Sequence, residues 1–240
     1  MKILLVIPAY NEEENILKTY ESIIDYNKKN KTNYDVIVIN DGSKDNTEKV
    51  LCENNIPHVK LIQNLGIGGA VQTGYKYAYL NDYDIAIQYD GDGQHDVSYV
   101  KTIADPIING KYNMVIGSRF KTEEDDNFKS SFMRRVGINI LSFIIKSKTG
   151  VKIYDTTSGF RAIDREIMAL FKDKYPTEYP EPISTVDVLK RGYKVTEVPV
   201  KMKAREKGKS SITPLKSAYY MVNVVLSILV MKVVKKWVRN

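Results

Sequence analysis

The chain has 240 residues, enough for one large domain or two small ones, and its hydrophobic fraction of 43% is typical of a globular protein. A single cysteine, Cys52, excludes an intramolecular disulfide bond, and the first apolar run is too short for a signal peptide, so we expect a cytoplasmic protein. The net charge of +7 favours an anionic partner (nucleic acid, a membrane surface or a phosphorylated substrate), unless the basic residues only form a solvated face.

Apolar runs alternate with helical patterns through the first half of the chain. Strands are predicted at 2–7, 34–39, 58–62, 84–89 and 113–117, with helices at 12–30, 45–54, 67–79 and 96–109. Asn11 is the expected N-cap of the first helix. This alternation predicts an α/β fold with a parallel sheet covered by helices. The first four strands each end in polar residues, which such a sheet gathers at one edge.

The second half of the chain is less regular. The pattern predicts a helix at 132–146, a turn and short strand at 155–162, a helix at 185–191 and a strand at 193–200. Between them lies a proline-rich segment at 175–182, which we expect to be irregular. An acidic loop is expected at 121–131 and a basic loop at 203–211.

A final helix is predicted from Pro214 to about Val238. Its apolar part, residues 218–231, spans about 21 Å at 1.5 Å per residue, which is short of the roughly 30 Å hydrocarbon core of a bilayer. The wide apolar arc and the basic far end favour a helix that lies in the membrane interface. Packing on the domain and a dimer contact are the alternatives.

Two carboxylates, Asp90 and Asp92, follow the predicted fourth strand and face the same way in an extended segment. Such a pair repels itself unless a cation lies between its members, and oxygen ligands suit Mg²⁺ or Mn²⁺. An EF-hand calcium loop is excluded, because His95 and Lys101 occupy its required Gly and Glu positions. A solvated turn in which Asp96 caps the next helix is the structural alternative.

A glycine-rich stretch at 64–70 follows the predicted third strand. It is not a dinucleotide fingerprint, because position 71 is Val71 and the fingerprint follows a first strand. The stretch predicts either a close approach to a phosphate or ribose, or tight helix packing. With Cys52 alone and only His58 and His95 as histidines, the sequence predicts no zinc site.

Seven motifs together resemble the family-2 glycosyltransferases of GT-A fold, in the branch similar to dolichol-phosphate mannose synthase and bacterial polyprenyl-phosphate glycosyltransferases. They fall in the family's order and cover about residues 3–215. The motifs are Ile-Pro-Ala-Tyr-Asn-Glu at 7–12, Asn-Asp-Gly-Ser at 40–43, the glycine-rich stretch at 64–70, Asp-Gly-Asp-Gly-Gln-His at 90–95, Gly-Ser-Arg at 117–119, Ser-Gly-Phe-Arg at 158–161 and Arg-Glu-Lys-Gly-Lys-Ser-Ser at 205–211.

The resemblance implies a catalytic domain over residues 1–212 and an amphipathic, membrane-associated helix over 213–240. It also implies four groups of site residues. The nucleotide-sugar group is Pro8, Tyr10, Glu12, Asp41, Asn64, Gly66, Gly69, Asp90, Lys209 and Ser210. The ligands of Mg²⁺ or Mn²⁺ are Asp90, Asp92 and Gln94; the acceptor-phosphate group is Arg119, Arg135 and Ser158; the catalytic group is Asp92, Arg119 and Arg205.

The implied reaction is an inverting, metal-dependent transfer from a UDP-, GDP- or dTDP-linked sugar to undecaprenyl or dolichyl phosphate. It would occur at the inner face of the membrane, with a small membrane protein or a second copy as a further partner and no nucleic acid. One alternative is transfer to a sugar hydroxyl of a polysaccharide precursor, with Glu178 or Glu181 as the base. A remoter alternative is a nucleotidyltransferase, which would release pyrophosphate.

Overall fold

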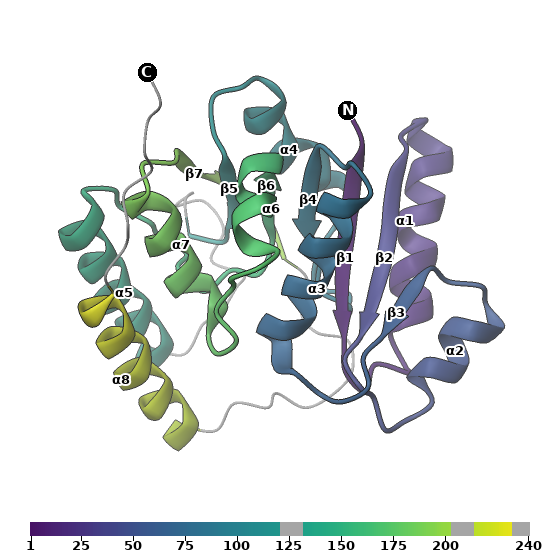
Figure 1. Ribbon diagram of the computed structural model, residues 1–240, viewed down its shortest axis with the longest axis horizontal. Helices are drawn as coiled ribbons and strands as arrows, with labels where there is room; N and C mark the ends of the chain where they lie inside the picture. The colour runs from purple at the N-terminus through teal and green to yellow at the C-terminus, as the bar shows by residue number, and fades with distance from the viewer. Residues whose placement is uncertain (121–131, 203–213, 232–240) are drawn as a thin grey trace.

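The computed structural model describes residues 1–120, 132–202 and 214–231 (Figure 1). Within these residues, seven strands form one sheet in the order β3-β2-β1-β4-β6-β5-β7. The strands are β1 (Ile3–Ala9), β2 (Tyr34–Asn40), β3 (His58–Lys60), β4 (Ile85–Gln88), β5 (Met114–Ser118), β6 (Arg161–Asp164) and β7 (Val195–Pro199). The α-helices are α1 (Ile16–Asn30), α2 (Thr47–Glu53), α3 (Gly66–Leu80), α4 (Val100–Ile108), α5 (Phe132–Thr149), α6 (Arg165–Phe171), α7 (Pro180–Lys190) and α8 (Pro214–Val230).

The sheet is parallel except for β6. Strand β1 pairs in parallel with β2 and β4, whereas β6 runs antiparallel between β4 and β5. The carboxyl ends of the parallel strands therefore lie at one edge, and the start of β6 at Arg161 lies at that same edge. This topology confirms the predicted α/β class. The sequence pattern had not predicted that one strand, β6, is antiparallel.

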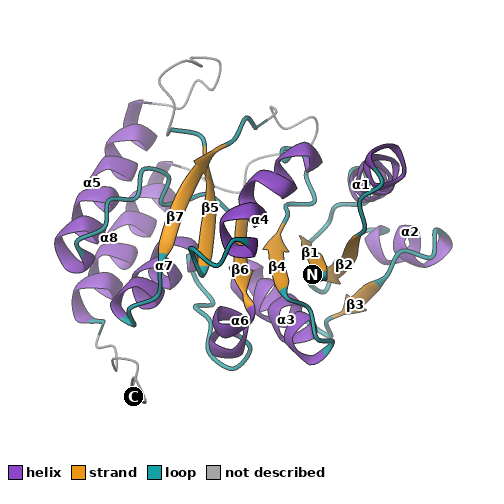
Figure 2. Cartoon of the chain, turned by 90° about the horizontal axis from the view of Figure 1, so that it is seen from above, coloured by secondary structure: helices purple, strands orange, loops and turns teal. Residues whose placement is uncertain are grey.

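Helices cover both faces of the sheet (Figure 2). Neighbouring residues of β1 point to opposite faces: Leu4 and Val6 belong to one buried cluster with α3 and α6, and Leu5 and Ile7 to another with α1 and α4. Strands buried on both faces read as continuous apolar runs, which explains why the sequence pattern located them.

Several helix starts differ from the prediction. Helix α4 begins at Val100, four residues late, after a 3₁₀ turn at Val97–Tyr99, and the pattern did not predict α6. Helix α1 begins at Ile16, four residues late, because the Asn11 side chain accepts a hydrogen bond from the Lys44 N–H and joins the loop after β2 instead of capping the helix. Helix α7 begins at Pro180, inside the segment expected to be irregular, since proline fits the first helical position, where no N–H is needed.

The last described helix, α8, packs beside α5 at the β7 end of the sheet (Figures 1 and 2). Its Val224 and Ile228 are buried in the same cluster as Leu141 and Ile145 of α5. Of the alternatives raised for this helix, packing on the domain is thus observed. Among the described helices, none combines the length and apolarity needed to cross a membrane.

Candidate active site

The loops after β2 and β3 meet around Asp41 at the carboxyl edge of the sheet. Asp41 is 3% exposed; its Oδ1 accepts a hydrogen bond from the Leu65 N–H at 2.7 Å, and its carbonyl accepts one from Asn64 Nδ2 at 3.2 Å. Burial raises the pKa of Asp41, and the N–H groups of Leu65 and Gly66 oppose that rise. The structure therefore brings together Asp41, Asn64 and Gly66, and their role in binding a nucleotide sugar stays a prediction.

The loop after β1 lies against the same region. The Asn11 N–H donates to Ser43 Oγ at 3.0 Å, and the Glu12 N–H donates to Thr47 Oγ1 at 2.9 Å. Tyr10 remains 42% exposed, so its ring is accessible to a ligand. Three strand ends thus contribute to one polar region.

Within the glycine-rich stretch, two glycines are buried against protein. A Cβ on Gly68 would lie 2.3 Å from the Pro176 carbonyl oxygen, and one on Gly69 would lie 2.4 Å from Leu65 Cβ. Of the two expectations for this stretch, tight packing describes Gly68 and Gly69. The role of Gly69 in binding a nucleotide sugar stays a prediction.

The acidic pair follows β4, and His95 holds its first member. The Asp90 N–H donates to His95 Nδ1 at 3.0 Å, so Nδ1 is the acceptor and Nε2 carries the hydrogen, 3.5 Å from Asp90 Oδ2. Burial lowers the pKa of His95, although the charges of Asp90 and Asp92 oppose this. His95, which had no predicted role, accepts the Asp90 N–H and lies beside the Asp90 carboxylate.

The residues around the acidic pair fit a hard divalent cation. The side chain of Asp90 is 33% exposed, and the Gln94 N–H donates to Asp92 Oδ1 at 3.1 Å. A Cβ on Gly159 would lie 3.2 Å from both Asp90 oxygens, so glycine keeps the space beside this carboxylate open. Paired carboxylate oxygens are the donor set that Mg²⁺ and Mn²⁺ prefer; the assignment of Asp90, Asp92 and Gln94 as ligands stays a prediction.

Arg119, predicted to face the acceptor phosphate, forms an ion pair that sequence reasoning missed. Its Nε and Nη2 donate to the two oxygens of Asp155 at 2.7 and 2.8 Å, and the exposed fractions of the two side chains are 8% and 0%. Burial lowers the pKa of Arg119, but Asp155 outweighs this and raises it. Ser158 Oγ donates to the Gly117 carbonyl at 2.6 Å, so both predicted residues also brace the edge of the sheet.

Glu181, at the start of α7, lies in a buried network beside the acidic pair. Arg161 is fully buried and donates from Nη1 to the Glu181 carbonyl at 2.7 Å and to Thr185 Oγ1 at 2.9 Å. Burial raises the pKa of the Glu181 carboxyl; the Arg161 charge opposes this rise and the Asp90 charge adds to it. Glu178 is exposed. Of the two candidate bases, Glu181 is thus the one whose pKa is affected by the charge of Asp90.

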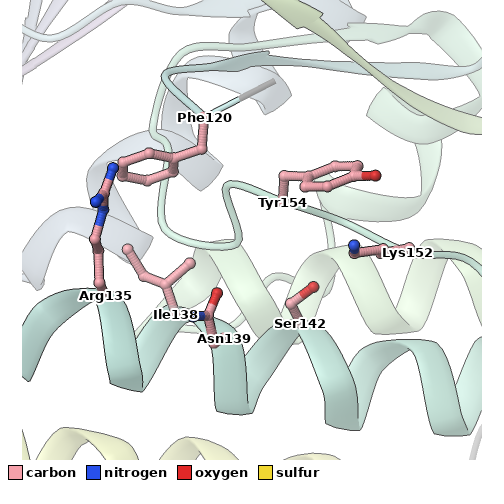
Figure 3. Close-up of a pocket in the computed structure, with 7 residues that line it drawn as sticks. All are labelled: Phe120, Arg135, Ile138, Asn139, Ser142, Lys152 and Tyr154. Atoms are coloured by element: carbon pink, nitrogen blue, oxygen red, sulfur yellow. The ribbon is translucent and has the colours of Figure 1, made fainter. Parts of the chain in front are cut away.

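A pocket of about 320 Å³ opens between α5 and the segment that leads to Asp155 (Figure 3). Two cations, Arg135 and Lys152, lie among its polar and aromatic residues. The full lining is Phe120, Arg135, Ile138, Asn139, Ser142, Lys152 and Tyr154. Lys152 was not predicted as a site residue. Arg205, Lys209 and Ser210 lie outside the described residues.

Taken together, the doubly covered sheet and the carboxylates at its carboxyl edge are typical of the α/β transferases of GT-A fold. The family model described as Glycosyl transferase family 2 matches residues 4–171. The chain therefore belongs to glycosyltransferase family 2, as the motifs predicted, and is a glycosyltransferase.

Individual relatives agree with this assignment. The UDP-N-acetylglucosamine--dolichyl-phosphate N-acetylglucosaminyltransferase of Methanococcus voltae is 33% identical over 219 residues, covering 83% of this chain and 84% of that protein. The polyprenol monophosphomannose synthase of Mycolicibacterium smegmatis is 26% identical, covering 88% and 80%. The fold is similar to glucosyl-3-phosphoglycerate synthase from Mycobacterium tuberculosis, solved with Mn²⁺, UDP and phosphoglyceric acid, with a TM-score of 0.68, 20% identity, and coverage of 95% of this chain and 77% of that one.

Proposed function

We propose that this glycosyltransferase moves a sugar from a nucleoside diphosphate sugar to a polyprenyl phosphate, with inversion at the anomeric carbon. The observation that carries the proposal is the shared edge at which Asp41, Asp90 and Asp92 follow β2 and β4. Asp41 would contact the base or ribose, and Asp90 and Asp92 the diphosphate. The relatives named for dolichyl-phosphate and polyprenol substrates support the acceptor.

Asp90, Asp92 and Gln94 would hold a Mg²⁺ or Mn²⁺ ion. When bound, this ion would stabilise the negative charge that develops on the leaving nucleoside diphosphate. The solved fold neighbours that contain Mn²⁺ or Mg²⁺ with UDP support the use of such an ion. His95 would keep the Asp90 carboxylate oriented toward it through the contacts described above.

The pocket beside α5 would receive the acceptor phosphate. A phosphate monoester has a second pKa of about 6, so it is largely dianionic near neutral pH and attacks without a strong base. Arg135 and Lys152 supply positive charge in this pocket. Arg119 would offer hydrogen-bond donors at the edge of the sheet, and its pairing with Asp155 would fix its position.

The outer surfaces of α5 and α8 support the proposal that the enzyme acts at a membrane surface; the inner face is part of the proposal. The apolar outer face is the set of exposed side chains on these two helices, with exposed fractions between 38% and 73%: Val136, Ile140, Phe143, Val222, Leu226, Leu229 and Val230. These residues recur at helical spacing and lie opposite the buried residues of the same helices. Such helices bind an interface without spanning it.

The desolvated carboxyl of Glu181 favours a second candidate function, transfer of the sugar to a hydroxyl group of another sugar. A carboxyl with a raised pKa near the reacting groups is suited to accept a hydroxyl proton. A phosphate acceptor needs no such base. The two candidates therefore differ in what Glu181→Gln does to turnover.

The test is a panel of UDP-, GDP- and dTDP-sugars with Mn²⁺, with and without polyprenyl phosphate, scored for nucleoside diphosphate release. We expect release that depends on polyprenyl phosphate and falls at least about 100-fold in Asp92→Asn, which weakens charge stabilisation. Glu181→Gln should retain most activity, as should its control Glu178→Gln. Transfer only to a sugar hydroxyl, abolished by Glu181→Gln, would establish the second candidate; pyrophosphate release would establish a nucleotidyltransferase.

A further inference from the structure

Three metal-ligating side chains converge between α2 and β3, outside the site described above. Glu48 and Cys52 are four residues apart on α2 and so share a helix face. His58 is the first residue of β3. Cys52 Sγ lies 3.9 Å from His58 Nε2, which lies 3.7 Å from Glu48 Oε1. The three donor atoms all lie within 4.8 Å of one another.

Two of the three ligands are held in a binding orientation by their neighbours. His58 Nδ1 lies 2.7 Å from the Ile56 carbonyl oxygen, which only accepts, so Nδ1 carries the hydrogen and Nε2 presents its lone pair to the cluster. Asn40 Nδ2 donates to Glu48 Oε2 at 2.6 Å, which turns Oε1 toward His58. Hydrogen bonds of this kind fix metal ligands in known metal sites.

We propose that Glu48, Cys52 and His58 bind one Zn²⁺ ion, with water as the fourth ligand. A thiolate, an imidazole and a carboxylate form a ligand set for zinc, whereas Mg²⁺ prefers oxygen ligands alone. With Zn–S of about 2.3 Å and Zn–N of about 2.0 Å, tetrahedral ligand atoms lie roughly 3.3–3.6 Å apart. The Cys52–His58 pair at 3.9 Å and the His58–Glu48 pair at 3.7 Å need to close by only a few tenths of an ångström to reach that geometry. The Cys52–Glu48 pair lies within 4.8 Å and closes by rotation of these side chains.

One neighbouring cation competes for this position. Lys60 Nζ lies 3.5 Å from Glu48 Oε1, and its side chain is 58% exposed. A long exposed lysine can turn into solvent, so zinc displaces an ammonium group that is weakly held. Zinc binds the thiolate, so binding also releases the thiol proton of Cys52 to solvent, and the affinity rises with pH.

The zinc ion would join the short edge strand β3 to α2. Asn40, which holds Glu48, is the last residue of β2 and precedes Asp41. The sequence predicted no zinc site because its one cysteine and two histidines do not show the spacing of a zinc motif. The structure removes this reason, since the turn between α2 and β3 brings both side chains to one point.

The experiment measures alkylation of Cys52, the only cysteine of the chain, by iodoacetamide in the full-length protein. Saturating ZnCl₂ should slow alkylation at least tenfold, and EDTA should restore the rate. MgCl₂ should have no effect. In His58→Gln and Glu48→Gln the protection should need at least tenfold more zinc, whereas Glu53→Gln, a matched change on the same helix, should behave as the parent.

A second measurement uses Co²⁺ in place of zinc. The parent should show the absorption band of thiolate-to-cobalt charge transfer, and Cys52→Ser should lack it; circular dichroism checks that each variant is folded. The proposal is overturned if zinc leaves alkylation of the parent unchanged, or if folded His58→Gln is protected as well as the parent. Neither readout depends on sugar transfer, so the result stands apart from the proposed function.

Discussion

At the scale of single residues, Glu197 and Asp155 organise the polar edge of the sheet. Glu197 accepts the N–H groups of Tyr154 and Asp155 at 2.8 and 2.7 Å, and Asp155 in turn pairs with Arg119. Removing one partner of such a buried ion pair leaves an uncompensated charge, which costs about 3–5 kcal/mol. These carboxylates therefore fix the side chain that is predicted to face the acceptor.

Glu197 should make stability depend on pH. Burial raises the pKa of Glu197 above its usual value of 4.5, although the two N–H groups oppose the rise. The folded state therefore holds this proton to a higher pH than the unfolded chain. Its contribution to stability is complete below about pH 4.5 and is lost as the pH rises through the raised pKa.

We expect Glu197→Gln to remove this pH dependence. The free energy of unfolding of the parent relative to that of the variant should fall between pH 4.5 and 7, as measured by urea titration. Glu178→Gln, which changes an exposed carboxyl, is the control. An identical pH profile for parent and Glu197→Gln would contradict the assignment.

At the scale of elements, the start of α3 is fixed by close backbone approach. Gly68 lies under the segment that leads to α7, whose Pro176 and Thr177 carbonyl oxygens would be 2.3 and 2.4 Å from an added Cβ. Backbone cannot move aside as a flexible side chain does. The glycine-rich stretch therefore positions a helix as well as any ligand near it.

Gly68→Ala should lower the free energy of unfolding by about 1–3 kcal/mol, the usual cost of overpacking. Gly137→Ala in α5 is the matched control, because its Cβ would meet the flexible Met221 side chain, with the sulfur nearest at 3.2 Å. Alanine is favoured over glycine within a helix by roughly 0.5–1 kcal/mol, so the control should be neutral or stabilising. Thermal and urea unfolding measure both; equal effects would refute the packing argument.

At the scale of the whole molecule, the apolar outer face of α5 and α8 lies at the end of the sheet occupied by β7 (Figure 1). The cationic pocket also uses α5, through Arg135 and Ile138. An acceptor with a lipid tail and a phosphate head would meet both surfaces together. Membrane contact and acceptor binding are thus both expected to depend on α5.

Phe143→Ser combined with Leu226→Ser should weaken binding to anionic lipid vesicles at least about tenfold. Burying each large apolar side chain contributes about 1.5–3 kcal/mol, and 1.4 kcal/mol is a factor of ten. Co-sedimentation with vesicles measures this. Ile108→Ser, which removes an exposed apolar residue from α4, is the control. Equal loss in the control, or none in the double variant, would exclude this face.

The sequence by itself located six of the seven strands, and with them the grouping of Asp41, Asp90 and Asp92 at one edge; the turn and strand predicted at 155–162 overlap β6 (Arg161–Asp164) only at its first two residues. Their positions follow from local rules, since buried parallel strands are continuous apolar runs and share a carboxyl edge. The motifs identified the family for a similar reason, because each is a short contiguous segment that can be recognised without knowing the fold. The Arg119, Arg135 and Ser158 assignments stay predictions, as do those of Arg205, Lys209 and Ser210.

Only the tertiary structure decided the direction of β6, the pairing of Arg119 with Asp155, and the meeting of Glu48, Cys52 and His58. Each depends on how elements pack and on where turns bring their ends, and no periodicity within one element encodes that. The contact between His95 and Asp90 also depends on tertiary structure. The two residues are only five apart in sequence, yet it is the fold of the loop that brings the His95 ring against Asp90.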